Sequence, residues 1–255
     1  MCFKYISHFI FITSRINNIF IIKFYIMNKV IEKLEKEEKP LISSVDRDEF
    51  ITASEKAFDC IFDGTSKFYP WKLPKNIPSK FSIGVIVGSS GSGKSTMLKH
   101  FGTEEKLIWE ANKSIVSHFE NPDEAINKLG SVGLNTVPSW YKPYDVLSNG
   151  EKFRADLARR IKSNSVIDEF TSVVDRNVAK AASVSMSRYV RKNNLENIVI
   201  STCHSDIVDW LEPDWVLNTD TGELLDGFFL SDQKSISRYI AQQMIVGELL
   251  RTITI

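Results

Sequence analysis

The sequence predicts an α/β fold in which helices flank a mostly parallel β-sheet. Two apolar segments rich in β-branched residues, 81–87 and 197–202, have the length and composition of buried strands. Segments of helical character lie between these strands and a shorter apolar segment at 165–168. Because parallel neighbours must be joined by a crossover, usually a helix, this alternation indicates strands that run in one direction.

The elements of this fold are expected in chain order from local composition and breaker residues. Strands are expected in short apolar or β-branched segments at 55–64, 81–87, 106–110, 165–168 and 197–202. Helices or short helical turns are expected at 93–101, 113–130, 148–162 and 175–192. Three prolines exclude regular structure from 66–80. We expect 206–217 to finish the edge of the sheet, and 235–253 has the pattern of an amphipathic helix.

Length, charge and cysteine usage favour one domain in a reducing compartment. The chain has 255 residues, enough for one substantial core, and 32 Lys plus Arg residues balance 32 Asp plus Glu residues. This balance gives no general attraction to nucleic acid or to an anionic membrane. Three widely spaced cysteines without a C-x-x-C pair argue against a disulfide framework or a zinc site. We therefore expect a cytoplasmic protein.

The N-terminal part of the chain has a different composition from the rest. Residues 1–26 are rich in Phe, Ile, Lys, Asn and Tyr, and polar residues interrupt each apolar run well short of the roughly 18 residues that a membrane span needs. We interpret them as a non-native or disordered extension before Met27; a membrane-associated segment, or an ordinary strand or helix, are the alternatives. Residues 27–50 are expected to form a charged leader, solvated as a helix or tail, and 51–255 the folded domain.

The most specific motif directly follows the strand at 81–87. The segment GSSGSGKST fits the pattern G-x-x-x-x-G-K-[ST] of a phosphate-binding loop, or P-loop. Glycines let backbone N–H groups converge on phosphate oxygens, and the following helix adds its positive end. Lys94 is expected to reach the β and γ phosphates, and Ser95 to occupy one Mg²⁺ position. The residues expected to bind the nucleotide here are Gly88, Ser89, Ser90, Gly91, Ser92, Gly93, Lys94, Ser95 and Thr96.

Two carboxylates and a histidine follow the next apolar strands. Asp168 and Glu169 end the strand at 165–168, where the carboxyl edge of a parallel sheet would bring them beside the P-loop. Asp168 can hold Mg²⁺, directly or through water, and Glu169 can polarise the water that attacks the γ phosphate. His204, after the strand at 197–202, can hydrogen-bond both phosphate and water when its imidazole is neutral. Capping or solvated residues are the alternative interpretation of all three.

Five motifs follow one another in a fixed order: GSSGSGKST, LSNGE, VIDEF, SVVD and TCH. In this order they resemble the P-loop, signature, carboxylate pair, D-loop and switch histidine of the ATP-binding cassette (ABC) ATPases. The resemblance implies a P-loop NTPase fold of ABC type over 51–255, with a reduced helical subdomain over about 111–163. It further implies Mg²⁺-dependent hydrolysis of ATP with Glu169, His204 and Lys94 as catalytic residues.

The resemblance also implies an ATP-dependent homodimer. In the family two cassettes pair head to tail, and the signature of one subunit covers the γ phosphate held by the P-loop of the other. Ser148, Asn149 and Gly150 are expected to make this contact at the positive end of a helix, and Asp175 of the D-loop is expected near the same nucleotide. Ser148 and Glu151 have the spacing of a capping box, which satisfies the helix end when ATP is absent.

The chain departs from the family in its signature and in the length of its helical part. Asn149 and Glu151 stand where the family has glycine and glutamine. Only 54 positions separate Lys94 from Ser148, so the subdomain that docks transporter cassettes onto membrane partners is short. That stretch contains no glutamine to act as the family's Q-loop residue. Three residues are candidates for its role: Glu110, Asn112 and His118.

An aromatic residue ahead of the P-loop stacks on adenine in this family. Tyr69 is the residue expected in that role, with Phe68 and Trp71 in the same region. Base stacking on an aromatic ring contributes about 1–3 kcal/mol. The alternative is a turn cluster packed under the neighbouring prolines.

Three functions fit these features. The first is a soluble ABC ATPase that dimerises on ATP and drives a partner protein or nucleic acid, as non-transport members do. The second is the nucleotide-binding subunit of a membrane transporter, against which the short helical subdomain and the missing glutamine weigh. The third is an ATP-gated binding protein with vestigial hydrolysis, against which the intact Glu169 weighs.

Overall fold

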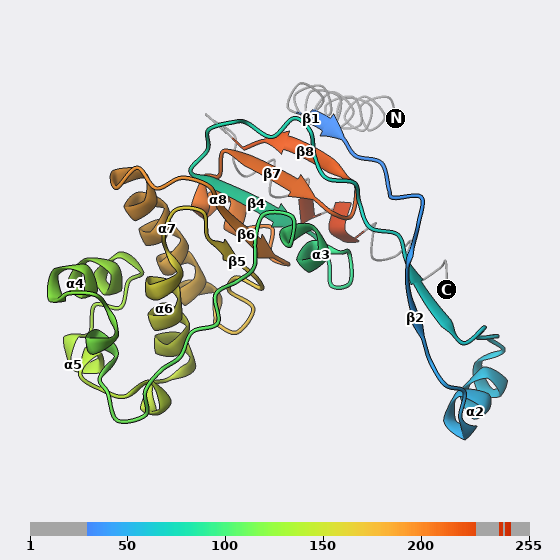
Figure 1. The fold of residues 1–255 in the computed structure, drawn as a ribbon, viewed down its shortest axis with the longest axis horizontal. Coiled ribbons are helices and arrows are strands. Elements are labelled where there is room, and N and C mark those ends of the chain that lie inside the picture. Colours follow the sequence, from blue (N-terminus) through green and yellow to red (C-terminus); the bar gives the residue numbers. More distant parts are fainter. Residues whose placement is uncertain (1–29, 228–239, 242, 246–255) are drawn as a thin grey trace, which may run out of the picture.

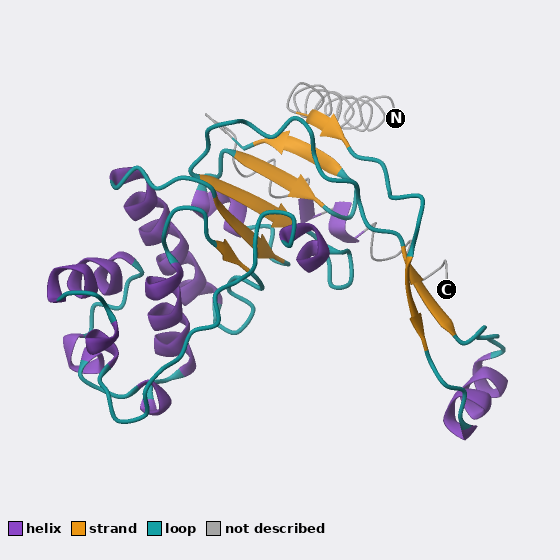
Figure 2. Cartoon of the chain, in the orientation of Figure 1, coloured by secondary structure: helices purple, strands orange, loops and turns teal. Residues whose placement is uncertain are grey.

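The computed structural model describes residues 30–227, 240, 241 and 243–245. It consists of a central sheet with helices on both faces, a lobe of short helices and a projecting arm (Figures 1 and 2). Residues 1–26, interpreted above as an extension, and most of the amphipathic pattern at 235–253 lie outside the described residues. Within the described part of the chain, no helix is long and apolar enough to cross a membrane.

The sheet has six strands in the order β1-β8-β7-β4-β6-β5. Their bounds in that order are Val30–Lys33, Glu223–Asp226, Trp215–Asn218, Ile83–Val87, Ile198–Thr202 and Val166–Ile167. The four strands from β7 to β5 are parallel, whereas β8 and β1 add antiparallel pairs at one edge. The predicted α/β class with a mostly parallel sheet is confirmed.

Alternation along β4 distributes its side chains to two apolar layers. Val85 and Val87 belong to the cluster that includes helices α7 (Arg176–Lys192) and α8 (Ile207–Leu211). Ile86 belongs to the opposite cluster, with residues of α3 (Lys94–Leu98). Because successive side chains of a strand point to opposite faces, one fully buried strand anchors both layers. The loop after β4 is therefore fixed at its start.

The helical lobe lies beside α6 (Asn149–Arg160) and away from the sheet (Figure 1). Its short elements are η1 (Ile115–His118), α4 (Pro122–Ser131), α5 (Val137–Trp140) and η2 (Tyr144–Val146). Buried residues of α4 and α6 pack in the same cluster as α7. The lobe is thus continuous with the core through α6 and α7.

The arm projects from the opposite side of the molecule (Figures 1 and 2). It consists of an antiparallel pair, β2 (Leu41–Ser44) and β3 (Thr65–Phe68), with α2 (Glu49–Phe58) between them. No residue of α2 is buried. The arm returns to the body at Phe68, next to the P-loop.

Several predicted elements are wrong, and long-range pairing or capping explains each difference. No part of 55–64 is a strand: Asp48 accepts from Ile51 N–H and begins α2, which continues to Phe58, and β3 starts only at Thr65. The stretch 106–110 is irregular, since its polar groups bond to α6 instead of to a strand. The segment 206–217 does not finish the sheet: β7 lies between β4 and β8.

The charged leader contributes to the sheet. Residues 30–33 form β1, which pairs with β8, in place of a solvated helix or tail. The proline-rich stretch 66–80 begins within β3 and is without helix or strand from 69 onward, apart from an isolated bridge at Trp71. The predicted helices at 148–162 and 175–192 are confirmed as α6 and α7 to within two residues at each end.

Candidate nucleotide site

The P-loop has the backbone that a phosphate cradle requires. Gly91 and Gly93 have φ values of 73° and 97°, in the region that favours glycine. A Cβ atom at Gly88 would lie 2.2 Å from Oγ1 of Thr219 and 2.6 Å from Oγ of Ser92, so only glycine fits there. The loop motif and its three glycines therefore agree with the geometry.

The turn between β7 and β8 holds the loop from below. Asp220 accepts hydrogen bonds from the backbone N–H of Ser89 at 2.9 Å and from its hydroxyl at 2.7 Å. The hydroxyls of Ser92 and Thr219 are 2.7 Å apart. Ser89 and Ser92 are both buried. These two serines consequently anchor the loop through their side chains.

A cavity of about 400 Å³ opens above the P-loop. Lys94 lies at its wall and donates from Nζ to the carbonyl of Ser89 at 2.8 Å. Ten residues line the cavity: Phe68, Ser90, Gly91, Gly93, Lys94, Ser95, Thr96, Glu169, Ser172 and Cys203. The structure thus brings the P-loop and the predicted catalytic carboxylate Glu169 to one space.

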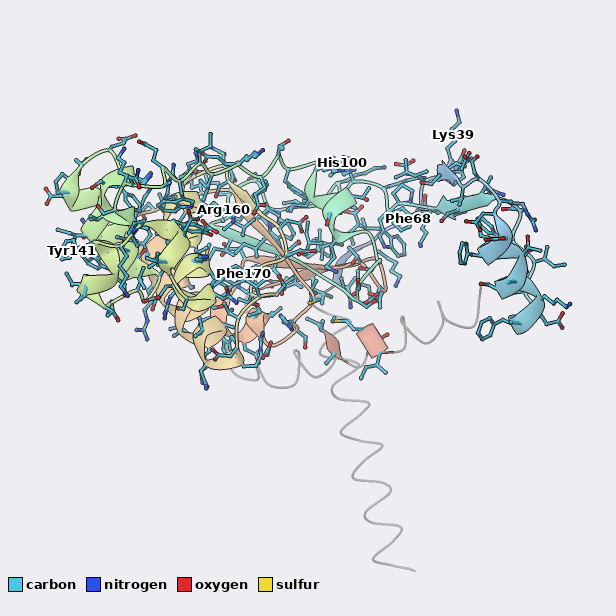
Figure 3. All side chains as sticks on the ribbon, turned by 90° about the horizontal axis from the view of Figure 1, so that it is seen from below. Lys39, Phe68, His100, Tyr141, Arg160 and Phe170 are labelled. Atoms are coloured by element: carbon cyan, nitrogen blue, oxygen red, sulfur yellow. The ribbon has the colours of Figure 1, made fainter. Side chains whose placement is uncertain are left out.

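The aromatic residue at this cavity is Phe68. Its ring lies against Gly93, with Cζ 2.5 Å from the position of a Cβ there, and Figure 3 shows it where the arm meets the body. Tyr69 is 44% exposed and does not line the cavity. The indole of Trp71 donates to the carbonyl of Thr219 at 2.6 Å, under the β7–β8 turn.

The carboxylate pair sits in a turn whose backbone is held by β6. Asp168 accepts hydrogen bonds from the hydroxyl of Ser201, a buried residue of β6, and from Glu169 N–H at 3.0 Å. Glu169 has a φ of 48°, a rare conformation for this residue type. Glu169 lines the P-loop cavity and also, together with Asp168, a neighbouring cavity of about 420 Å³ beside α6.

His204 is held next to this turn. Its Nδ1 is 3.2 Å from Oγ1 of Thr171, a buried residue with a φ of 66°. Burial lowers the pKa of the imidazole, the positive charge of Arg176 lowers it further, and Asp206 opposes these effects. The lowered pKa favours the neutral form of the ring, which is the form that the expected phosphate contact requires.

The tip of α6 is exposed. Ser148 and Asn149 are solvent-accessible, and a Cβ at Gly150 would meet nothing nearer than 3.8 Å within its own subunit. The predicted capping box is confirmed: Glu151 accepts from Ser148 N–H at 2.9 Å and from its hydroxyl at 2.8 Å. Ser139 also donates to Glu151 at 2.5 Å. These hydrogen bonds lower the pKa of Glu151 to about 2.

Other residues expected at the site lie elsewhere in this subunit. Asp175 caps α7 by accepting from the backbone of Asn177 and Val178, and it does not line the P-loop cavity. The Q-loop candidates are also outside that cavity. Their positions are on or near the loop before η1: Glu110, Asn112 and His118.

Sequence reasoning missed the residues that support the site. Ser201, Thr171 and Asp220 hydrogen-bond to Asp168, His204 and Ser89, which are expected site residues, without belonging to a recognised position of a motif. One signal was available for Ser201, because it is a polar residue within an apolar strand. Asp220 lies 131 positions from Ser89, so no local pattern connects them.

The residues present fit a nucleoside triphosphate with Mg²⁺. Backbone amides and Lys94 suit phosphate, while the hydroxyl of Ser95 and the carboxylate of Asp168 are oxygen ligands of the kind Mg²⁺ prefers. Among the described residues, no group of three or more His, Cys, Asp or Glu side chains forms a metal centre. This agrees with Mg²⁺ sites that use one or two protein ligands together with substrate phosphates.

The chain is similar to known ATP-binding proteins in sequence and in structure. No protein-family model matches the chain. Over 228 residues it is 26% identical to the energy-coupling factor transporter ATP-binding protein EcfA1 of Caldanaerobacter subterraneus subsp. tengcongensis, covering 70% of this chain and 80% of that protein. The chain also resembles two solved structures. One is a dimeric post-hydrolysis state of the ATP-binding cassette MJ0796 bound to ADP and Pi (15% identity, TM-score 0.45, 76% and 94% coverage of this chain and that chain). The other is an inward-facing putative metal-chelate type ABC transporter (14%, 0.48, 79% and 90%).

Proposed function

Because this chain is an ATP-binding cassette ATPase, we propose that it works as a homodimer that closes head to tail on ATP and opens after hydrolysis. One observation carries the proposal: the tip of α6 is exposed, and none of Ser148, Asn149 and Gly150 lines the P-loop cavity of its own subunit. A second copy is the simplest source of these groups. The cycle of closing and opening would drive a partner protein or nucleic acid in the cytoplasm.

Within one subunit, the P-loop residues divide the work of binding. Backbone N–H groups from Gly91 to Thr96 hold the phosphates, and Lys94 turns from the carbonyl of Ser89 to their β and γ oxygens. Ser95 and Asp168 hold Mg²⁺, which when bound neutralises phosphate charge. For adenine we favour Phe68 over Tyr69, because Phe68 lines the cavity.

The catalytic groups act on water and on the γ phosphate. Glu169, at the wall of the cavity, accepts a proton from the attacking water or orients it. The neutral imidazole of His204, fixed through Thr171, hydrogen-bonds the γ phosphate. The turns after β5 and β6 fix the backbone of both residues, so both side chains are preorganised before ATP binds.

The partner subunit completes the site. Ser148, Asn149 and Gly150 at the start of its α6 would cover the γ phosphate with free N–H groups and a positive helix end. Asp175 uses only Oδ1 in its cap, and Oδ2 has no hydrogen bond among the described residues. We assign that oxygen to contacts across the dimer.

The Glu169→Gln variant tests this function. With the base removed, ATP binds but is not hydrolysed, so size-exclusion chromatography at saturating ATP should show a stable dimer. Without nucleotide the same variant should elute as a monomer. A monomer under both conditions would contradict the shared site. Phosphate release by the wild type no greater than that of Lys94→Ala would instead support vestigial hydrolysis.

A second candidate, the nucleotide-binding subunit of a transporter, is favoured by the similarity to EcfA1, which is a transporter protein. The short helical lobe is the surface that such a role would use. Pull-down with the ATP-locked Glu169→Gln protein distinguishes the two. A partner with several membrane spans would establish the transporter role, and a partner without spans would establish the first proposal.

A further inference from the structure

The loop after α3 lies along α6, at the boundary between the sheet and the helical lobe. We call residues 104–109 the strap. Three side-chain contacts fasten it: Glu105 with Lys162 at 2.5 Å, the carbonyl of Ile108 with Arg159 at 2.7 Å, and Trp109 with Asp156 at 2.8 Å. The strap is therefore joined to the C-terminal part of α6 and to the residues just after it.

Glu104, the first residue of the strap, also contacts the catalytic turn. Its Oε1 accepts a hydrogen bond from Asp168 N–H at 3.1 Å. The same oxygen lies 3.6 Å from Nε of Arg160, the last residue of α6. Nε of Arg160 is buried and has no hydrogen bond among the described residues. Figure 3 shows Arg160 between the lobe and the sheet.

We propose that Glu104 is a positioning residue that couples the signature helix α6 to the carboxylate turn of Asp168 and Glu169. The inference rests on the homodimer proposed above, in which the tip of α6 contacts a nucleotide in the partner subunit. A helix moves as a rigid rod, so a shift at its tip reaches Arg160 at its end. Through Glu104 that shift acts on the backbone N–H of Asp168. A carboxylate that serves both groups thus links dimer closure to the position of the Mg²⁺ ligand.

Position in space supports Glu104 over the residues expected from sequence. Glu110 pairs with Lys113 in the loop before η1, and His118, the last residue of η1, accepts a hydrogen bond from Glu110 N–H. Neither contacts the carboxylate turn, whereas Glu104 does. The coupling residue is accordingly an acidic side chain at the start of the strap.

The chain offers a matched control in the next residue. Glu105 has the same charge, belongs to the same strap and pairs with Lys162 at the same helix end, but it has no hydrogen bond to Asp168. Glu104→Gln keeps an oxygen that can accept from Asp168 N–H and removes the ion pair with Arg160. The pair Glu104→Gln and Glu105→Gln therefore separates coupling from a general loss of charge.

Each substitution is placed in the Glu169→Gln background, and the Mg²⁺ concentration that gives half-maximal ATP-driven dimerisation is measured. We expect Glu104→Gln to raise this Mg²⁺ concentration about five- to tenfold, a range typical of coupling between contacting residues. Glu105→Gln should leave the Mg²⁺ concentration within about twofold of the parent value. Arg160→Gln should raise this Mg²⁺ concentration by the same factor as Glu104→Gln. The double variant should need no more Mg²⁺ than either single variant. Thermal unfolding without nucleotide tests folding, and Arg160→Met, which also removes the charge but keeps an unbranched apolar side chain, serves if Arg160→Gln does not fold.

Three results overturn the inference; two overturn the coupling and one overturns the homodimer. Dimerisation of Glu104→Gln with the same Mg²⁺ dependence as Glu105→Gln overturns the coupling alone. Additive effects of Glu104→Gln and Arg160→Gln do the same, because they would show that the two residues act separately. Absence of any ATP-driven dimer in the parent Glu169→Gln protein overturns the homodimer itself.

Discussion

The P-loop is held by buried side chains of its own subunit, whereas the tip of α6 is held by its capping box and by Ser139 and is otherwise exposed. Behind the P-loop, Asp220 and Thr219 of the β7–β8 turn bond to two buried serines. In front of the α6 tip, Ser148 and Asn149 face solvent, and Glu151 satisfies the helix end. The P-loop half of the site is therefore preorganised within one subunit. The other half is an exposed helix end that, in the proposed homodimer, contacts the nucleotide of the second subunit.

This difference determines how each half responds to substitution. Changes in the cradle alter nucleotide binding in the subunit that carries them, because its geometry exists before ATP arrives. Changes at the tip are expected to alter closure of the proposed dimer and the stability of α6. Three substitutions test this division, from the largest expected effect to the smallest.

Lys94→Ala should have the largest effect. Lys94 is the cation at the wall of the P-loop cavity, and its loss removes the charge that stabilises the β and γ phosphates. We expect the rate of phosphate release at saturating ATP to fall by about a hundredfold or more. Lys99→Ala, at an exposed position after α3, is the control and should retain the wild-type rate. Equal rates for the two variants would place the reacting phosphate outside this loop.

Asp220→Ala should have an intermediate effect. It deprives the buried Ser89 of the acceptor for its N–H and hydroxyl, so the loop loses its support. We expect ATP affinity, measured by calorimetric titration, to fall about tenfold through lost preorganisation. The free energy of unfolding in urea should fall by about 1–3 kcal/mol, the cost of unsatisfied buried groups. Thr221→Val is the control, since Thr221 bonds to Glu223 in the same turn and not to the P-loop.

The cradle and the central strands were predictable because their signals are local. The P-loop motif occupies nine consecutive residues, and β4 and β6 are short apolar runs. Asp220 and Glu104 were not predictable, since each acts on a residue more than sixty positions away. Their positions follow from how the strands are ordered in the sheet, which no local pattern specifies.

Local signals also misled where an element is not packed against the core. The residues of 55–64 suggested a strand, but this segment ends the helix α2, and Phe58 is 81% exposed on the arm. Capping by Asp48 decides that segment in favour of a helix. Tyr69 was expected to stack on adenine, but the neighbouring Phe68 lines the cavity. Successive residues of an extended chain point in opposite directions. One position decides which ring faces the cavity.

Glu151→Gln should have the smallest effect, and its pH dependence identifies its cause. Hydrogen bonds from Ser139 and Ser148 lower the pKa of Glu151 from 4.5 to about 2 in the folded protein. A carboxylate with a lowered pKa stabilises the folded state above its unfolded pKa, and this contribution is lost as pH falls through the folded value. The wild type should therefore exceed the variant in stability at neutral pH and approach it between pH 4.5 and 2.

The size of this difference is that of a helix cap. We expect Glu151→Gln to lower the free energy of unfolding by about 0.5–1 kcal/mol at pH 7, because the group is partly exposed and solvent screens its charge. Urea unfolding of both proteins at pH 7 and pH 3 measures it. Asp145→Asn removes an exposed negative charge just before α6 and should change stability little at either pH. A stability difference for Glu151→Gln that does not shrink at pH 3 would show that packing of the side chain, and not the ionised cap, holds the tip of α6.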